Sequence, residues 1–163
     1  MLQWKVFSAA PHRMMFFGGL VQIMLTLMFW FIELLCRYAF STTLPSVIPN
    51  TWAHAFLLVF ATIPFFIFGF LMTTYPRWMG GEIIPLKNYS LAFKLLFSGS
   101  LLFYLGLFVH KGLLMFAVAS LLAGWIVAVH ALWTVYMNAP SKNKKYEKVL
   151  NVSLFIAILS IIS

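Results

Sequence analysis

Long apolar stretches with few charges are the feature that most constrains this chain. Four of them occupy residues 14–40, 52–74, 89–109 and 113–136. An α-helix rises about 1.5 Å per residue, so about 20 residues cross the hydrocarbon of a bilayer. Only 9% of the residues are charged, whereas soluble domains carry about 25%. The sequence therefore predicts an all-α, polytopic transmembrane helical bundle with four full spans, in one domain over residues 1–163.

A fifth apolar segment, residues 149–162, is only fourteen residues long. This is short of the about 20 residues that a spanning helix needs. Two interpretations are open: the segment lies partly in the membrane interface, or the sequence stops within a fifth span that is cut short. We favour the second, which makes residues 1–163 the N-terminal portion of a larger protein.

Basic residues predict the orientation of the spans. If the N-terminus is cytoplasmic, only Arg37 and Lys111 of the eleven basic residues lie outside. The other nine then lie on the cytoplasmic side: Lys5, Arg13, Arg77, Lys87, Lys94, Lys142, Lys144, Lys145 and Lys148. Lys and Arg are enriched in cytoplasmic loops, so we predict a cytoplasmic N-terminus. We expect the last four lysines to contact anionic lipid headgroups, and no nucleic acid to be bound.

The second apolar stretch ends in a distinctive sequence. It reads Tyr75, Pro76, Arg77, Trp78, Met79, Gly80 and Gly81. Proline disfavours helix at the residue before it, and a glycine pair permits a sharp reversal. We therefore predict that the helix ends at Thr74, with Tyr75 and Trp78 at the level of the headgroups.

The same region resembles the NnrS family of bacterial membrane proteins. A histidine, His54, opens the span, and a "GFL-T" run is closed by Pro-x-Trp-x-Gly. The matching residues are Gly69, Phe70, Leu71, Thr73, Pro76, Trp78 and Gly80. Residues 11–19, "PHRMMFFGG", also resemble the family's entry to its first span.

The resemblance implies a protein of the bacterial inner membrane with about twelve spans of bilayer-crossing length. This chain would be its N-terminal part, and the missing C-terminal helices would be partners. The resemblance further implies that the protein binds haem and copper and is linked to nitric-oxide stress. A common form of the motif begins His-Ala-His-Glu, whereas this chain has Phe56 and Leu57 at the last two positions.

Histidines are the candidate haem ligands, because imidazole commonly holds haem iron and copper. His54 and His130 lie within apolar sequence, and we predict that they contribute to haem binding. The alternative for each is a hydrogen bond to a backbone carbonyl. His110 lies beside Lys111, and His12 lies next to a basic residue. For these two we favour a structural role over metal binding.

Glu33 and Cys36 are spaced i, i+3 and lie on one face of the first span. Joined by His54 or His110, they would offer copper a mixed oxygen, sulfur and nitrogen set, with His12 as a further weak candidate. The alternative is an i, i+4 ion pair between Glu33 and Arg37 near the interface. We favour the ion pair.

Three residues predict local helix geometry. Pro64, inside the second stretch, predicts a kink and a carbonyl freed from its helical hydrogen bond. Gly106 and Gly124 predict close approach of neighbouring helices.

Three functional hypotheses follow. The first is a haem- and copper-binding membrane protein that protects against nitric-oxide stress, as the resemblance implies. The second is a transporter or channel, with Pro64 and buried polar residues on the substrate path. The third is a structural membrane subunit without a cofactor. The sequence contains no serine–histidine–acid set and no phosphate-binding glycine loop, and whether the protein is an enzyme is left open.

Overall fold

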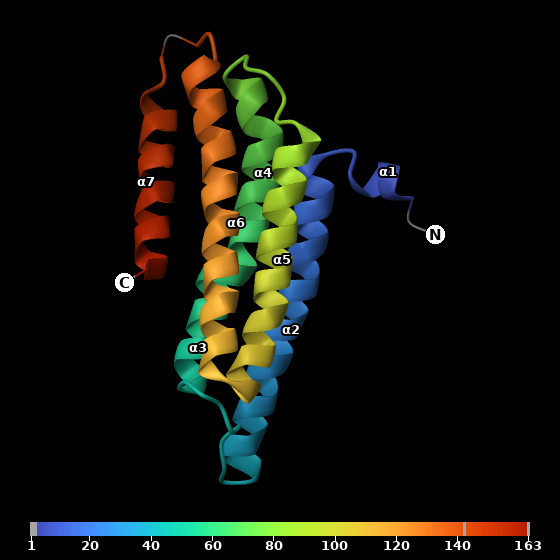
Figure 1. Cartoon of the computed structure of the whole chain (residues 1–163), viewed down its shortest axis with the longest axis vertical. Helices are drawn as coiled ribbons and strands as arrows, with labels where there is room; N and C mark the ends of the chain where they lie inside the picture. Colours follow the sequence, from blue (N-terminus) through green and yellow to red (C-terminus); the bar gives the residue numbers. More distant parts are fainter. Residues whose placement is uncertain (1–2, 142, 163) are drawn as a thin grey trace.

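The computed structural model describes residues 3–141 and 143–162, and every regular element in these residues is a helix (Figure 1). The elements are α1 (Trp4–Phe7), α2 (Pro11–Ala39), α3 (Asn50–Phe56), the π-helix η1 (Leu57–Thr62), α4 (Ile63–Trp78), α5 (Leu86–Val109), α6 (Lys111–Asn138) and α7 (Lys145–Ile162). The prediction of an all-α chain is confirmed for these residues.

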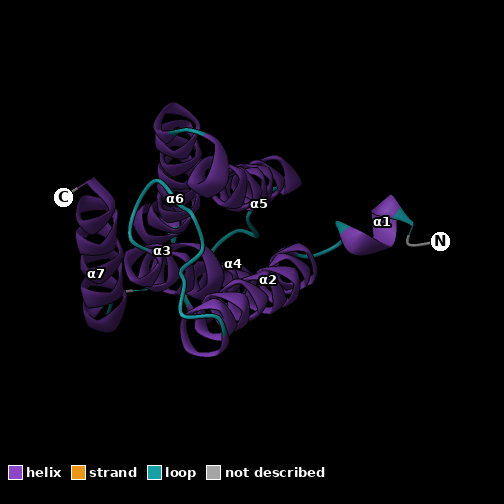
Figure 2. Cartoon of the chain, turned by 90° about the horizontal axis from the view of Figure 1, so that it is seen from below, coloured by secondary structure: helices purple, strands orange, loops and turns teal. Residues whose placement is uncertain are grey.

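Four helical segments are long and apolar enough to cross a membrane: α2, the continuous run Asn50–Trp78, α5 and α6. They run alternately down and up the bundle in Figure 1, and Figure 2 shows them side by side from one end. The prediction of a bundle with four full spans is therefore confirmed. Residues 40–49 connect α2 to α3 at the lower end of Figure 1, and residues 79–85 connect α4 to α5 at the upper end.

Helix α7 begins at Lys145, four residues earlier than the predicted segment, and lies beside α6 (Figure 1). Its polar residue Asn151 is fully buried. The Asn151 Nδ2 donates a hydrogen bond of 2.7 Å to the hydroxyl of Tyr75 on α4. This contact corrects the prediction for Tyr75: its side chain is 0% exposed and lies inside the bundle, because a polar partner on α7 meets its hydroxyl there.

The predicted end of the second span is also wrong, since α4 continues past Thr74 to Trp78 with Pro76 inside the helix. Gly80 ends the helix, at a φ of +61° that favours glycine. The Gly81 N–H donates to the Pro76 carbonyl at 2.8 Å, and the Gly80 N–H donates to Arg77 at 3.3 Å. These are the two bonds of a Schellman motif. The glycine pair therefore terminates the helix, and proline only removes one donor within it.

The π-helix η1 ends at Thr62, two residues before Pro64, and has the wider turn of that helix type. Pro64 has no N–H to give to the carbonyl of Phe60, four residues earlier. The indole Nε1 of Trp125 on α6 donates to that carbonyl instead, at 3.0 Å. The predicted freed carbonyl is thus present, and a tryptophan from another span satisfies it.

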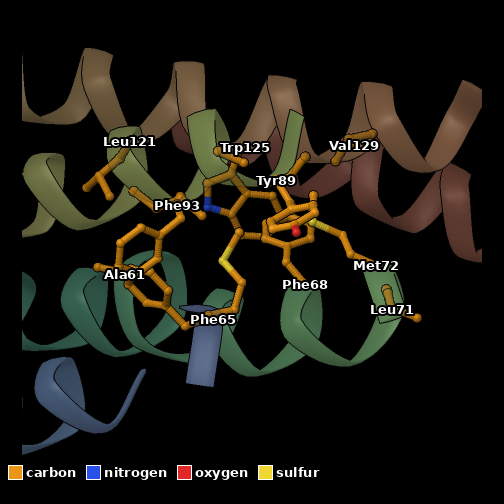
Figure 3. Close-up of a cluster of buried hydrophobic side chains, with 14 of the residues drawn as sticks. Ala61, Phe65, Phe68, Leu71, Met72, Tyr89, Phe93, Leu121, Trp125 and Val129 are labelled. Atoms are coloured by element: carbon orange, nitrogen blue, oxygen red, sulfur yellow. The ribbon is translucent and has the colours of Figure 1, made fainter. Parts of the chain in front are cut away.

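The core contains buried side chains of α2, α4, α5 and α6. Figure 3 shows the part between α4, α5 and α6, where aromatic and aliphatic side chains interlock. Helices α5 and α6 approach so closely that a Cβ on Gly106 would lie 2.7 Å from the Cα of Leu114. A Cβ on Gly124 would lie 3.0 Å from the backbone N of Leu96. The predicted role of both glycines is therefore confirmed.

Candidate functional site

Glu33, near the end of α2, is the most heavily bonded charged side chain of the described residues. It is 0% exposed. Its Oε1 accepts from Arg37 Nη2 at 2.6 Å, which confirms the predicted i, i+4 ion pair. Its Oε2 accepts from the backbone N–H of Leu44 at 3.0 Å and from Asn50 Nδ2 at 2.8 Å. The carboxylate thus ties the 40–49 loop and the start of α3 to α2.

Asn50 begins α3, and its side-chain amide is hydrogen-bonded through the nitrogen but not through the oxygen. Its Nδ2 donates both to Glu33 and to the carbonyl of Leu44, at 2.9 Å. Its Oδ1 is buried and has no hydrogen-bond partner among the described residues. A cavity of about 490 Å³ lies here, lined by Glu33, Arg37, Asn50 and the loop between them.

His54 lies one helical turn further along α3 and is half-buried. Its imidazole stacks on the indole of Trp30 from α2, with ring centroids 4.3 Å apart and planes 17° apart. Its Nδ1 is buried and has no partner within the described part of the chain. Stacking therefore holds the His54 imidazole in place, while its Nδ1 makes no hydrogen bond.

His130, on α6, is exposed. It borders an apolar groove of about 210 Å³ between α6 and α7. The groove is lined by Ile126, Val129, His130, Trp133, Phe155 and Ile158. Trp133 and Phe155 meet edge to face across it, with centroids 5.6 Å apart. The histidine therefore presents its imidazole beside an otherwise hydrocarbon surface.

His110 and His12 make local contacts. The Nδ1 of His110 accepts from the Gly112 N–H at 2.9 Å and so caps the start of α6. The Nδ1 of His12 lies 3.3 Å from the hydroxyl of Thr73. Both contacts agree with the structural roles favoured from the sequence.

The candidate copper residues are distributed over different places. Cys36 is a half-buried free thiol on α2, and His110 and His12 lie at opposite ends of spans. Within residues 3–141 and 143–162, no three His, Cys, Asp or Glu side chains form a group that could hold a metal ion. Glu33 bonds to none of the other candidate copper residues: its two carboxylate oxygens accept from Arg37, Leu44 and Asn50.

A polar network inside the bundle was not predicted from the sequence. Thr26 on α2 contacts the hydroxyls of Thr62 at 3.0 Å and of Tyr104 at 2.9 Å. Gln22 Nε2 donates to the same Tyr104 hydroxyl at 3.1 Å. Thr62 is the last residue of the π-helix. The available signal was the i, i+4 spacing of Gln22 and Thr26, two polar residues on one face of an apolar span.

A family model described as NnrS protein matches residues 6–163. The chain belongs to the NnrS family. With four helices that can span a membrane, it is a multi-pass membrane protein of that family. No curated protein and no solved structure matches the chain.

The residues that carry the NnrS resemblance have structural contacts here. A Cβ on Gly69 would lie 2.7 Å from the ring of Phe16, so this glycine lets α2 and α4 pack closely. The hydroxyl of Thr73 accepts from the backbone N–H of His12 at 3.2 Å and thereby caps the N-terminus of α2. Trp78 is 57% exposed and touches the ring of Phe70, with centroids 5.5 Å apart. Gly69 and Thr73 of the motif therefore join α2 and α4 of the NnrS chain.

The lysines predicted to bind headgroups differ from one another. Lys144 Nζ donates to the carbonyl of Tyr136 at 2.6 Å and lies 5.3 Å from the centre of that ring. Lys145 and Lys148 are exposed. Lys142 lies outside the described residues. Lys144 therefore has an intramolecular role, and contact of the lysines with lipid stays a prediction.

Proposed function

We propose that this chain is the N-terminal part of an NnrS protein of the bacterial inner membrane that binds haem and contributes to resistance to nitric-oxide stress. The family match over residues 6–163 carries the proposal. The further helices that complete such a protein would pack against the four spans described above.

His130 is the first residue that we assign to haem. Haem is a flat, largely apolar group whose iron takes an axial imidazole. The groove beside His130 offers an apolar wall, with Trp133 and Phe155 next to the imidazole. In this role His130 would supply the ligand, and the hydrocarbon wall would exclude water from the iron. The groove is small for a whole haem, so the opposite wall would come from helices beyond this chain.

His54 is the second residue that we assign to haem. Its Nδ1 is buried without a hydrogen-bond partner, and coordination to haem iron would give this nitrogen a partner. The stack on Trp30 holds the ring in one plane. The bound haem would supply an iron that can take nitric oxide, while these residues would fix its position.

Copper has weaker support than haem in this part of the protein. The described residues contain no group of three His, Cys, Asp or Glu side chains able to hold an ion. Glu33, Cys36, His110 and His12 remain predictions for copper, and we assign no chemical step to them.

The proposal is tested on the full-length protein purified in detergent. We expect a Soret band, a haem content that falls in His130→Ala and His54→Ala, and no fall in His110→Ala. His110 is the control, because it is a histidine whose Nδ1 already caps a helix. A protein without haem, or with haem unchanged in both variants while insertion is normal, would overturn the assignment.

Transport is the second candidate function, and the polar network beside the π-helix favours it. Hydroxyl and amide groups within a span are expensive to bury and often line a pathway for a substrate. Thr26→Val would remove the central hydroxyl of the network while keeping the shape of the side chain. Uptake of a solute into proteoliposomes that fails in Thr26→Val, in a protein free of haem, would favour this candidate.

A further inference from the structure

A second cavity lies at the end of the bundle where two spans begin and another ends. Its volume of about 360 Å³ is within the range of about 300–1,000 Å³ that is usual for small-molecule sites. Pro11 and Leu86, which line it, are the first residues of α2 and α5, and Arg77 is the last residue but one of α4. The connection between α4 and α5, at the upper end of Figure 1, supplies more of the wall. Because spanning helices begin and end near the membrane surface, the cavity lies at the level of the lipid headgroups.

Arg77 is the only charged residue that lines this cavity. Its exposed side chain forms no hydrogen bond or ion pair with the other described residues. The sequence contains three acidic residues, and none of them, Glu33, Glu82 or Glu147, is part of the lining. A guanidinium has five N–H donors in a planar fork. The lining therefore has a net positive charge and a set of donors to which the described residues offer no acceptor.

The other polar side chains of the lining are already hydrogen-bonded. The Thr73 hydroxyl donates to a backbone carbonyl one turn earlier in α4, at 2.8 Å, and accepts from the His12 N–H at 3.2 Å. The Tyr89 hydroxyl donates to the carbonyl of Ser8 at 2.6 Å. Arg77 is thus the polar side chain of this lining that is left for a ligand.

Apolar side chains make up most of the remaining lining. Two of them are exposed at the end of the bundle, Ile83 at 78% and Leu86 at 45%. Aliphatic side chains in this position are more stable against hydrocarbon than against water. The lining therefore combines a cationic donor with an apolar surface, and a phospholipid matches these two parts with its phosphate and its acyl chains.

We propose that this cavity binds an anionic phospholipid, with the lipid phosphate on Arg77 and an acyl chain over Ile83 and Leu86. Arginine and phosphate form two parallel N–H···O hydrogen bonds in their preferred geometry. A zwitterionic lipid would bring a cationic amine to a wall that has no carboxylate to pair with it. Free inorganic phosphate would leave the apolar part of the wall uncovered. This site is separate from the histidines assigned to haem and from the lysines between residues 142 and 148.

The test is native mass spectrometry of the full-length protein, released from detergent micelles, with three probes. Phosphatidylglycerol is an anionic lipid, phosphatidylcholine carries the same phosphate and chains with a cationic amine, and inorganic phosphate has no chains. We expect phosphatidylglycerol to bind about tenfold more tightly than phosphatidylcholine, because only the latter leaves a cation unpaired. We also expect millimolar inorganic phosphate not to displace it. Equal binding of the two lipids, or displacement by inorganic phosphate, would overturn the proposal.

A pair of variants locates the binding. Arg77→Gln removes the cation from the lining. Lys87→Gln removes one positive charge from the same end of the bundle, and Lys87 is also exposed but does not line the cavity, so it is the matched control. We expect Arg77→Gln to weaken the tightest phosphatidylglycerol site about tenfold or more, and Lys87→Gln to change it by less than about twofold. Equal affinities of the two variants would overturn the proposal, because general attraction to charge does not depend on the cavity.

A second pair of variants keeps every charge in place. Ala9 is exposed and lines the cavity, so Ala9→Phe fills it from the rim. Val6 is also exposed but is not part of the lining, so Val6→Phe is the control. We expect Ala9→Phe to weaken phosphatidylglycerol binding about tenfold, since it takes up the space for the lipid, and Val6→Phe to leave binding unchanged. If Arg77→Gln failed to insert, this pair would decide alone, and unchanged binding in Ala9→Phe would overturn the proposal.

Discussion

The two ends of the bundle are closed in different ways. At the end that we predict to be cytoplasmic, Gly80 and Gly81 terminate α4 through backbone hydrogen bonds between neighbouring residues. At the opposite end, the 40–49 loop is held by the buried carboxylate of Glu33, which binds groups up to 17 residues away in the sequence. The first closure depends on local conformation and the second on a polar group shared by three segments. A local closure can be recognised in a sequence, whereas a shared one depends on how the chain folds.

The largest expected difference between the two ends is their accessibility. Single cysteines at Thr42 and at Ser141 should be labelled from opposite sides of the membrane. Most of the basic residues lie on the same side of the membrane as Ser141, which predicts that this side is cytoplasmic. The experiment uses a membrane-impermeant maleimide on intact cells in a Cys36→Ser background, which removes the native thiol. We expect label at position 42 and none at position 141. The reverse pattern would contradict the predicted orientation.

The next largest effect is expected from Glu33→Ala. This change removes the acceptor of the Leu44 N–H and of Arg37, and one of the two acceptors of Asn50 Nδ2. We expect a loss of about 3 kcal/mol in the free energy of unfolding, measured by thermal unfolding in detergent.

Glu147→Ala is the matched control for that change, because it removes a carboxylate that forms no ion pair within 4.0 Å among the described residues. Equal stability of the Glu33 and Glu147 variants would contradict the conclusion that the Glu33 carboxylate closes its end of the bundle.

A smaller effect is expected at the glycine closure. Gly80 has a φ of +61°, so Gly80→Val should destabilise the end of α4 by about 1–2 kcal/mol. Gly80→Asn should cost less, since asparagine tolerates this conformation better than a β-branched residue. Unfolding midpoints of both variants measure the difference. If Val and Asn behaved alike, backbone conformation at Gly80 would not be what closes this end.

The smallest effect is expected from Trp78→Tyr. Trp78 is 57% exposed and contacts Phe70, and tyrosine keeps an amphipathic ring in the same place. We expect a change of less than about 0.5 kcal/mol in stability and normal insertion. A modest defect in haem content or in nitric-oxide resistance is expected in cells. A large loss of stability would mean that Trp78 closes the bundle through contacts beyond the local ones.

Most features that depend on a residue's own neighbours in the chain were predicted from the sequence, the exception being the end of α4, which continues past Pro76 to Trp78. The four spans follow from their length and apolarity, the Glu33–Arg37 pair from its i, i+4 spacing, and the close packing at Gly106 from the absence of a side chain. The freed carbonyl before Pro64 follows from the missing proline N–H.

The candidate site was predicted less completely. Glu33 was recognised as a charged residue in a span, but its bonds to Leu44 and Asn50 depend on the return of the 40–49 loop. The histidines were assigned from their apolar surroundings, and only the folded chain places His54 against Trp30 and His130 at a groove on α7. Spacing within one helix gives no information about which helix faces it, so the hydrogen-bond partners on other spans were missed.

The sequence by itself determined that this chain is a bundle of spanning helices, because hydrophobic length is a property of local sequence. Membership of the NnrS family rests on the match of the family model to the sequence. Only the tertiary structure decided where the polar groups would be satisfied. Tyr75 turns inward to Asn151, and Trp125 bonds to the carbonyl that Pro64 leaves free. The physical reason is that a polar group in an apolar interior must find a partner, and the partner that it finds belongs to whichever helix packs beside it.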